Sequence, residues 1–166
     1  MHGAPHTIVR VESGEALESV RELFIEYARS LDFDLRFQDF DSELDSLPGD
    51  YAPPSGALLA AFEGAKASGC VALRRIDEST CEMKRLYVRP EHRGRGVGRS
   101  LAERIIRIAR AIGYRSMKLD TVSGMAEANA LYRSLGFVDT IPYRFNPLDG
   151  CLFLELRLDR FPDEAP

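Results

Sequence analysis

The sequence predicts one mixed α/β domain, and three observations support that fold class. The chain has 166 residues, which suits a single domain of ordinary size spanning residues 1–166. Apolar residues make up 45% and charged residues 29%, a balance typical of a globular protein and not of a disordered one. Segments with strand-like alternation and segments with helical spacing follow one another along the chain, which is typical of a sheet covered by helices.

The first third of the chain is expected to hold a strand, a long helix and an irregular segment. Residues 7–11 alternate like a short strand, and apolar residues between 17 and 31 recur at the three- and four-residue spacing of an amphipathic helix. Residues 32–56 are rich in aromatic and turn-forming residues, with room for one short helix at 41–47. Because such segments often cover functional sites, we expect 32–56 to lie on the substrate side.

The remainder alternates between predicted strands and helices. Apolar residues from 97 to 112 form a helical stripe that Gly113 ends, and a second helix is expected at 125–135, before Gly136. Six segments read as strands: 57–63, 68–76, 81–88, 116–122, 137–141 and 151–158.

Charge and hydropathy exclude several classes of protein. The net charge of −4 conceals a basic stretch, with nine Lys or Arg against three Glu in residues 82–110, and an acidic stretch, with twelve acids against three Arg in residues 12–50. This pattern disfavours a nucleic-acid partner and leaves a local anion site open. No apolar run approaches the ~18 residues that span a bilayer, and the N-terminus lacks the pattern of a secretory signal. We therefore expect a cytoplasmic protein with no membrane partner.

The cysteines and histidines give no sign of a disulfide or a metal. Three cysteines (Cys70, Cys81 and Cys151) lie in apolar, strand-like surroundings, which indicates buried thiols in a reducing compartment. Three histidines are scattered without metal-ligand spacing, and we interpret His92 as a solvated loop residue. No metal is expected.

The most informative segment is the glycine-rich turn at residues 93–100, RGRGVGRS, between a predicted strand and a predicted helix. Alternate glycines let backbone N–H groups approach a ligand, and the following helix adds its free amides and the positive end of its dipole. This arrangement predicts a phosphate or pyrophosphate cradle. A nucleotide P-loop is disfavoured because no Lys follows the glycines, and a dinucleotide fingerprint because Arg99 replaces its last glycine. The alternative without a ligand is a tight strand–helix turn.

The segment also resembles a known family. The pattern Arg93-x-x-Gly96-x-Gly98, entered from 86–91, is similar to the coenzyme-A signature of the GNAT N-acetyltransferase superfamily, and residues 129–137 resemble its second conserved block. The resemblance implies a mixed, mostly antiparallel sheet of about seven strands, splayed in the middle and flanked by about four helices. Residues 81–137 would form the acetyl-CoA-binding core. By that resemblance the coenzyme would contact Leu86, Tyr87, Val88, Arg93, Gly94, Arg95, Gly96, Val97, Gly98, Arg99, Ser100, Asn129 and Tyr132.

Two residues are candidates for the chemistry of acetyl transfer. Tyr132 would protonate the departing thiolate, and its alternative is a core tyrosine packed near Phe137. Glu82, expected on the same strand face as Leu86 and Val88, matches a position where some members carry a catalytic glutamate that acts as the base. Its alternative is a strand-end carboxylate paired with Lys84 or Arg85. Weaker candidates for the substrate side are Glu26, Asp39, Asp41, Tyr51 and Tyr143.

The predicted function is acetyl-CoA-dependent transfer of an acetyl group to a primary amine of a small molecule or peptide. No cysteine argues for an acyl-enzyme, so direct transfer in a ternary complex is expected. A catalytically inactive coenzyme-A-binding sensor or interaction module is the alternative, and a nucleotide-dependent enzyme is a third. The acidic stretch at 12–50 either favours a cationic acceptor or forms solvated helix faces. Because dimers are common in the resembling family, a homodimer is one of the expected assemblies.

Overall fold

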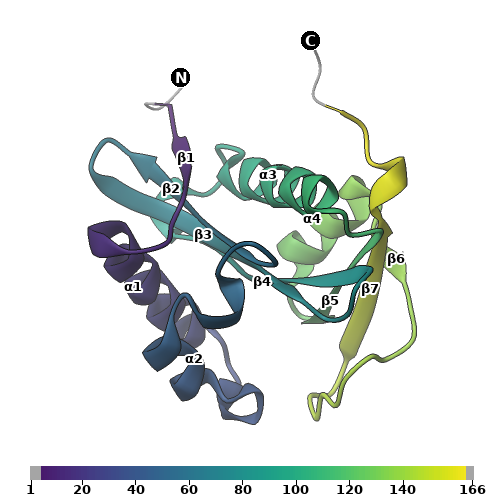
Figure 1. Cartoon of the computed structure of the whole chain (residues 1–166). Coiled ribbons are helices and arrows are strands. Elements are labelled where there is room, and N and C mark those ends of the chain that lie inside the picture. Colours follow the sequence, from purple (N-terminus) through teal and green to yellow (C-terminus); the bar gives the residue numbers. More distant parts are fainter. Residues whose placement is uncertain (1–4, 164–166) are drawn as a thin grey trace.

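A computed structural model describes residues 5–163 as a seven-stranded sheet with helices on both faces (Figure 1). Eleven strands and α-helices follow the order expected from the sequence: β1 (Thr7–Arg10), α1 (Gly14–Ser30), α2 (Phe40–Ser46), β2 (Ala57–Glu63), β3 (Lys66–Arg75), β4 (Thr80–Val88), α3 (Val97–Ile112), β5 (Ser116–Val122), α4 (Ala126–Leu135), β6 (Val138–Asp139) and β7 (Cys151–Arg157). Short 3-10 helices occupy Leu35–Gln38, Gly49–Tyr51, Pro90–His92 and Leu158–Arg160.

The sheet is mixed and splayed, as the resemblance implied. Its strand order is β1-β2-β3-β4-β5-β7-β6, and every neighbouring pair is antiparallel except β4 and β5. The parallel ladder joins only Thr80–Glu82 to Ser116–Lys118. The two strands then diverge, so the backbone of β4 beyond Glu82 is left without a strand partner on that side.

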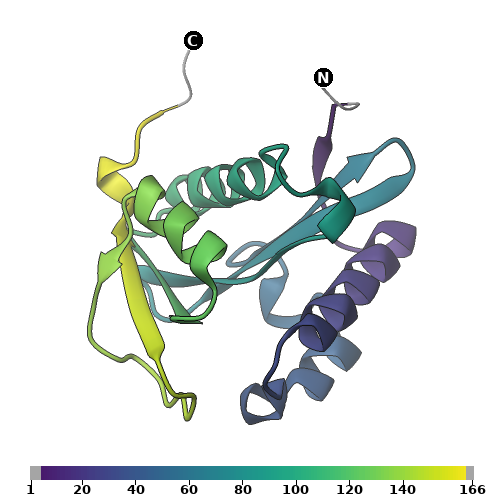
Figure 2. The same cartoon turned by 180° about the vertical axis from the view of Figure 1, so that it is seen from behind.

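Helices cover the two faces of the sheet separately. α1 and α2 lie on one face and α3 and α4 on the other, which Figures 1 and 2 show from opposite sides. Each face buries its own apolar cluster: Val20, Leu23 and Phe24 of α1 belong to one, and Leu101 and Ile105 of α3 to the other. The apolar stripes read from the sequence therefore point inward, where each fully buried Leu or Ile contributes about 1.5–3 kcal/mol.

A bulge in β4 corrects one expectation. Ala72 pairs with Lys84 and Cys70 pairs with Tyr87, so β4 has one residue more than β3 across this step. The extra residue is accommodated at Arg85, whose φ of 60° lies in the left-handed region. The bulge reverses the alternation of side chains, so Glu82 faces the α1 side while Leu86 and Val88 face α3. The expectation that the three share a face is wrong.

The segment 32–56 folds into α2 between two 3-10 helices and packs beside α1. One of its contacts with β4 is an ion pair in which Arg85 Nε and one terminal nitrogen each lie 2.9 Å from an oxygen of Glu43. The side chains of Arg85 and Glu43 are 3% and 14% exposed. A bidentate pair of this kind fixes both position and angle, so it anchors α2 over the bulge.

Cys70 and Cys81 are buried, Cys151 is half-buried, and all three are free thiols. Within residues 5–163, no helix combines the length and the apolar character that crossing a membrane requires.

Candidate active site

The glycine turn forms the N-terminal end of α3. Gly94 and Gly96 both have φ of 80°, a conformation that costs an L-residue about 1–2 kcal/mol. Gly96 is the N-cap of α3, and its carbonyl accepts the first helical bond from Ser100 at 3.0 Å. The backbone amides of the residues between Gly96 and Ser100 have no acceptor within the helix, and they point out of its positive end. The turn therefore has the glycine conformations and free amides that the expected anion cradle requires.

A cavity of about 470 Å³ opens in front of this turn, between β4 and the start of α4. A Cβ on Gly98 would lie 3.5 Å from Val88 and 3.9 Å from Leu131, so the missing side chain leaves room between strand and helix. Eight of the residues expected to bind coenzyme line this cavity: Leu86, Tyr87, Val88, Arg93, Gly94, Gly96, Val97 and Gly98.

Three other expected coenzyme-binding residues do not line the cavity. Arg95 lies 3.3 Å from Glu63, and Arg99 donates a 2.5 Å hydrogen bond to the hydroxyl of Ser134. Ser100 follows in the first turn of α3. For Arg95 or Arg99 to contact a phosphate, its side chain would have to leave Glu63 or Ser134, respectively.

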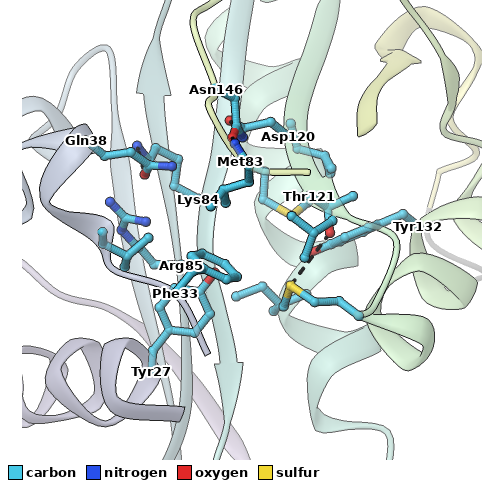
Figure 3. A pocket seen from close by; sticks show the side chains of 16 residues that line it. Tyr27, Phe33, Gln38, Met83, Lys84, Arg85, Asp120, Thr121, Tyr132 and Asn146 are labelled. Atoms are coloured by element: carbon cyan, nitrogen blue, oxygen red, sulfur yellow. Dashed lines mark hydrogen bonds between the residues drawn. The ribbon is translucent and has the colours of Figure 1, made fainter. Parts of the chain in front are cut away.

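A smaller cavity of about 50 Å³ continues into the splay between β4 and β5. Figure 3 shows Tyr132 and Thr121 on one wall and Lys84 and Gln38 on the other. Leu86 and Met125 line both this cavity and the larger one, so the two are adjacent. The splay thus brings polar groups from separate elements to one point.

Tyr132 lies in the C-terminal half of α4, and its buried side chain lines the small cavity. Its ring meets that of Phe137 edge-on at 5.8 Å between centroids. Burial raises the pKa of Tyr132 above its usual value, so the phenol keeps its proton at neutral pH. The residue both packs against Phe137, as the core interpretation expected, and lines the small cavity.

Asn129 fastens α4 to the end of β5. Its amide nitrogen donates to the carbonyl of Val122 at 2.9 Å, and its amide oxygen accepts from the hydroxyl of Thr121 at 2.9 Å. It lines neither of the two cavities described above. Both ends of the side chain are engaged, so Asn129 positions the helix that carries Tyr132.

Glu82 is fully buried and bound by three donors. Tyr143 donates at 2.6 Å and Arg74 at 2.7 Å, and Arg144 completes the set. Burial alone would raise the pKa of Glu82, but the positive charges of Lys84, Arg144 and Arg74 bring it below its usual value. The carboxylate is therefore ionised, and it forms ion pairs with Arg74 and Arg144, whereas the alternative interpretation named Lys84 or Arg85 as its partner.

Lys84 and Arg144 are functional candidates that the sequence reasoning missed. Lys84 is 8% exposed, and its Nζ lies 3.1 Å from Oε1 of Gln38. Burial and the charge of Arg85 lower the pKa of Lys84 to about 7, although Glu82 acts in the opposite direction. The signal available in the sequence was its two-residue spacing from Glu82 on one strand. Arg144 lies in the irregular segment before β7 and gave no signal.

A third cavity, of about 430 Å³, lies between α2 and β4. It shares Gln38 and Lys84 with the small cavity and therefore continues from it. Its lining carries both signs of charge: Asp39, Glu43, Asp50, Arg74, Lys84 and Arg144. Tyr51 also lines it, whereas Tyr143 does not and instead hydrogen-bonds the buried Glu82.

Two further candidates, Glu26 and His92, each lie beside a side chain of opposite charge or a carboxylate. Glu26 binds Arg89 at 2.6 Å across the face of α1. His92 is 5% exposed at the entrance to the glycine turn, and its Nδ1 lies 3.0 Å from Glu63. The interpretation of His92 as a solvated loop residue is wrong, because the 3-10 helix Pro90–His92 turns it inward.

Comparison with known proteins agrees with this geometry. The model of the family described as "Acetyltransferase (GNAT) family" matches residues 17–137. An uncharacterised N-acetyltransferase of Schizosaccharomyces pombe is 39% identical over 156 residues, which cover 93% of this chain and 96% of that protein.

Solved structures share the fold over nearly the whole chain. An acetyltransferase from Streptococcus agalactiae has a TM-score of 0.76 at 25% identity, covering 92% of this chain and 98% of that chain. A protein from Salmonella typhimurium, solved with its cofactor acetyl-CoA, has a TM-score of 0.67 at 25% identity, covering 96% and 99%. The splayed sheet with its cleft, together with these relatives, identifies the chain as an N-acetyltransferase. With the family match over most of its length, the chain belongs to the GNAT acetyltransferase family.

Proposed function

We propose that this chain transfers an acetyl group from acetyl-CoA to a primary amine of a small molecule or peptide, directly and within a ternary complex. The supporting observation is the row of three adjacent cavities along β4. The cavity at the glycine turn suits the donor, the mixed-charge cavity suits the acceptor, and the small cavity holding Tyr132 joins them. All three cysteines lie outside these linings, which supports direct transfer.

The donor cavity suits a long ligand that ends in phosphates. Acetyl-CoA supplies an acetyl group activated as a thioester. The amides around Gly94, Gly96 and Gly98 and the charge of Arg93 would hold its pyrophosphate. The backbone of Leu86, Tyr87 and Val88 would bind its amide-bearing arm, because this side of β4 lacks a strand partner. In this proposal Arg95, Arg99 and Ser100 lie at the outer rim, and Asn129 supports α4.

Tyr132 is proposed as the general acid. Burial raises the pKa of Tyr132, so the phenol stays protonated in the resting site and can give its proton to the sulfur as the bond between sulfur and the acetyl carbon breaks. Tyr132 lines the small cavity, which in this proposal joins the donor side to the acceptor side. The residue therefore assists the departure of the sulfur and not the binding of the coenzyme.

The general base has two candidates on one strand. Glu82 could accept a proton through water, but its three donors and its low pKa make it a weak base. Lys84 lines both the small cavity and the acceptor cavity, and a pKa of about 7 leaves much of it neutral at physiological pH. We therefore propose that Lys84 accepts the proton of the acceptor ammonium and that Glu82 keeps its pKa from falling further.

The acceptor is proposed to carry an amine and an anionic group together. Asp39 and Asp50 in the acceptor cavity would attract an ammonium, while Arg74 and Arg144 would attract a carboxylate. An amino acid or a peptide terminus has this pattern, whereas a polyamine has only the positive charges.

The experiment is an acceptor panel with acetyl-CoA, read by release of free coenzyme-A thiol and by mass spectrometry of the product. Amino acids, short peptides, polyamines and aminoglycosides form the panel. We expect N-acetylated product from at least one amino acid or peptide and slower reaction with polyamines. Tight binding of acetyl-CoA with no thiol release on any acceptor would support the inactive coenzyme-binding module instead.

A further inference from the structure

Three side chains that can ligate metals converge beside the entrance to the glycine turn, and one of them, His92, also lines the cavity in front of that turn. His6 lies just before β1, Glu63 ends β2, and His92 ends the 3-10 helix Pro90–His92. Each offers one ligand atom, and the three atoms lie within 4.8 Å of one another. Three segments that are distant in the sequence therefore meet at one point on the edge of the sheet.

The separations between these atoms fit a small tetrahedral ion. His92 Nδ1 lies 3.0 Å from Glu63 Oε2, His6 Nε2 lies 3.5 Å from His92 Nδ1, and His6 Nε2 lies 3.9 Å from Glu63 Oε2. Zinc binds nitrogen at about 2.0–2.1 Å, which places two ligands of a tetrahedral site about 3.3 Å apart. The three atoms are therefore spaced for one ion with small adjustments of the side chains.

The orientation and burial of the two imidazoles also suit a site. Their rings meet at 85° with centroids 5.5 Å apart, so they are not stacked and instead direct nitrogens toward the same carboxylate. The side chains of His6 and His92 are 12% and 6% exposed, and that of Glu63 is 26% exposed. The site is thus shielded by the imidazoles and open beside the carboxylate, where a water could complete four ligands.

The donor types at this point are ones that divalent cations use. Two neutral imidazoles and one carboxylate are a common donor set for zinc and similar first-row ions. Arg95 Nη1 lies 3.3 Å from Glu63 Oε2, so a cationic side chain already shares this carboxylate. A bound ion would replace Arg95 as the partner of the Glu63 carboxylate.

We propose that His6, Glu63 and His92 form a binding site for a divalent first-row transition metal ion, with Zn²⁺ as the best match. The ion would fasten the start of β1 to the segment that leads into the glycine turn. His92 also lines the donor cavity, but the inference does not rest on acetyl transfer, because metal binding is measured without coenzyme or acceptor.

The test is metal titration of the untagged full chain after removal of metals with a chelator. Zn²⁺ is titrated by calorimetry, and Co²⁺ is followed by the visible absorption of its four-coordinate complexes. We expect one equivalent to bind to the native chain, with a rise in melting temperature. His6→Ala and Glu63→Gln should each weaken binding at least 10-fold and remove the Co²⁺ band.

Two controls keep the result decisive. His2→Ala changes a histidine outside the described residues and should leave binding unchanged, whereas loss of binding in this variant would assign the ion to the chain terminus and overturn the proposal. The metal-free melting temperatures of His6→Ala and Glu63→Gln show whether the variants are folded. Absence of saturable binding to the native chain, or undiminished binding in both variants, would also overturn it.

Discussion

The hydroxyl of Tyr143 donates a 2.6 Å hydrogen bond to the buried carboxylate of Glu82. This contact joins the irregular segment before β7 to β4 at the point where β4 and β5 diverge. The same carboxylate binds Arg74 of β3 and Arg144. Glu82 therefore organises the charged groups of the acceptor cavity, and its chemical role is best tested together with that of its neighbour Lys84.

Replacing Lys84 with Met should remove the proposed base while keeping most of the buried chain length. We expect kcat/KM at pH 8 to fall by about 10²-fold, the lower end of what a general base contributes. The affinity for coenzyme A should be unchanged, because Lys84 does not line the donor cavity. Lys66→Met alters an exposed lysine at the start of β3 and is the matched control. Full activity in Lys84→Met would exclude Lys84 as the base.

Replacing Glu82 with Gln should shift the pH dependence of the rate. Lys84 must be neutral to accept a proton, so kcat/KM rises with pH through its pKa of about 7. Glu82 raises that pKa by its negative charge. Its removal therefore lowers the pKa and moves the rising limb to lower pH. A limb that disappears in Glu82→Gln and persists in Lys84→Met would assign the base to Glu82.

The arginines of the glycine turn should contribute unequally to coenzyme binding. Arg93 lines the donor cavity, whereas Arg99 is held by Ser134 and Glu103 outside it. We expect Arg93→Ala to weaken coenzyme A binding by about 10-fold, the effect of losing one charge-assisted hydrogen bond. Arg99→Ala should have a smaller effect, and Arg104→Ala, on the exposed side of α3, none. Calorimetry with coenzyme A measures these affinities, and equal losses at Arg93 and Arg99 would contradict the assignment.

The ion pair between Arg85 and Glu43 should stabilise the fold more than an exposed pair would. Glu43→Gln leaves the guanidinium, which is 3% exposed, without its charged partner. Breaking a buried pair from one side typically costs about 3–5 kcal/mol, so a loss near the lower limit is expected in the free energy of unfolding by urea. The double variant Arg85→Met, Glu43→Leu should recover part of it. A loss as small as that of Glu18→Gln on exposed α1 would contradict this account.

The elements that the sequence predicted well are those fixed by local pattern. The helix at 97–112 and the strand at 116–122 have the bounds expected, because apolar period, turn glycines and length are all encoded within each segment. The glycine turn was found for the same reason, since its residues are contiguous.

The features that escaped prediction depend on contacts between distant segments. The bulge at Arg85 places a residue other than glycine at positive φ, and its partner Glu43 lies 42 positions earlier. Arg144 reaches Glu82 from 62 positions away, out of an irregular segment without periodicity. His6 and His92 meet across 86 positions, so no ligand spacing is visible in the sequence.

The most direct test of the catalytic account compares Tyr132→Phe with the native chain, once the acceptor panel has identified a substrate. Steady-state release of coenzyme-A thiol gives kcat, and calorimetry gives the affinity for coenzyme A. We predict that kcat falls by about 10²-fold or more while this affinity changes less than about threefold, because a proton donor acts on the departing sulfur and not on binding. An unchanged kcat, or a loss confined to coenzyme affinity, would contradict the assignment of Tyr132 as the acid of this cleft.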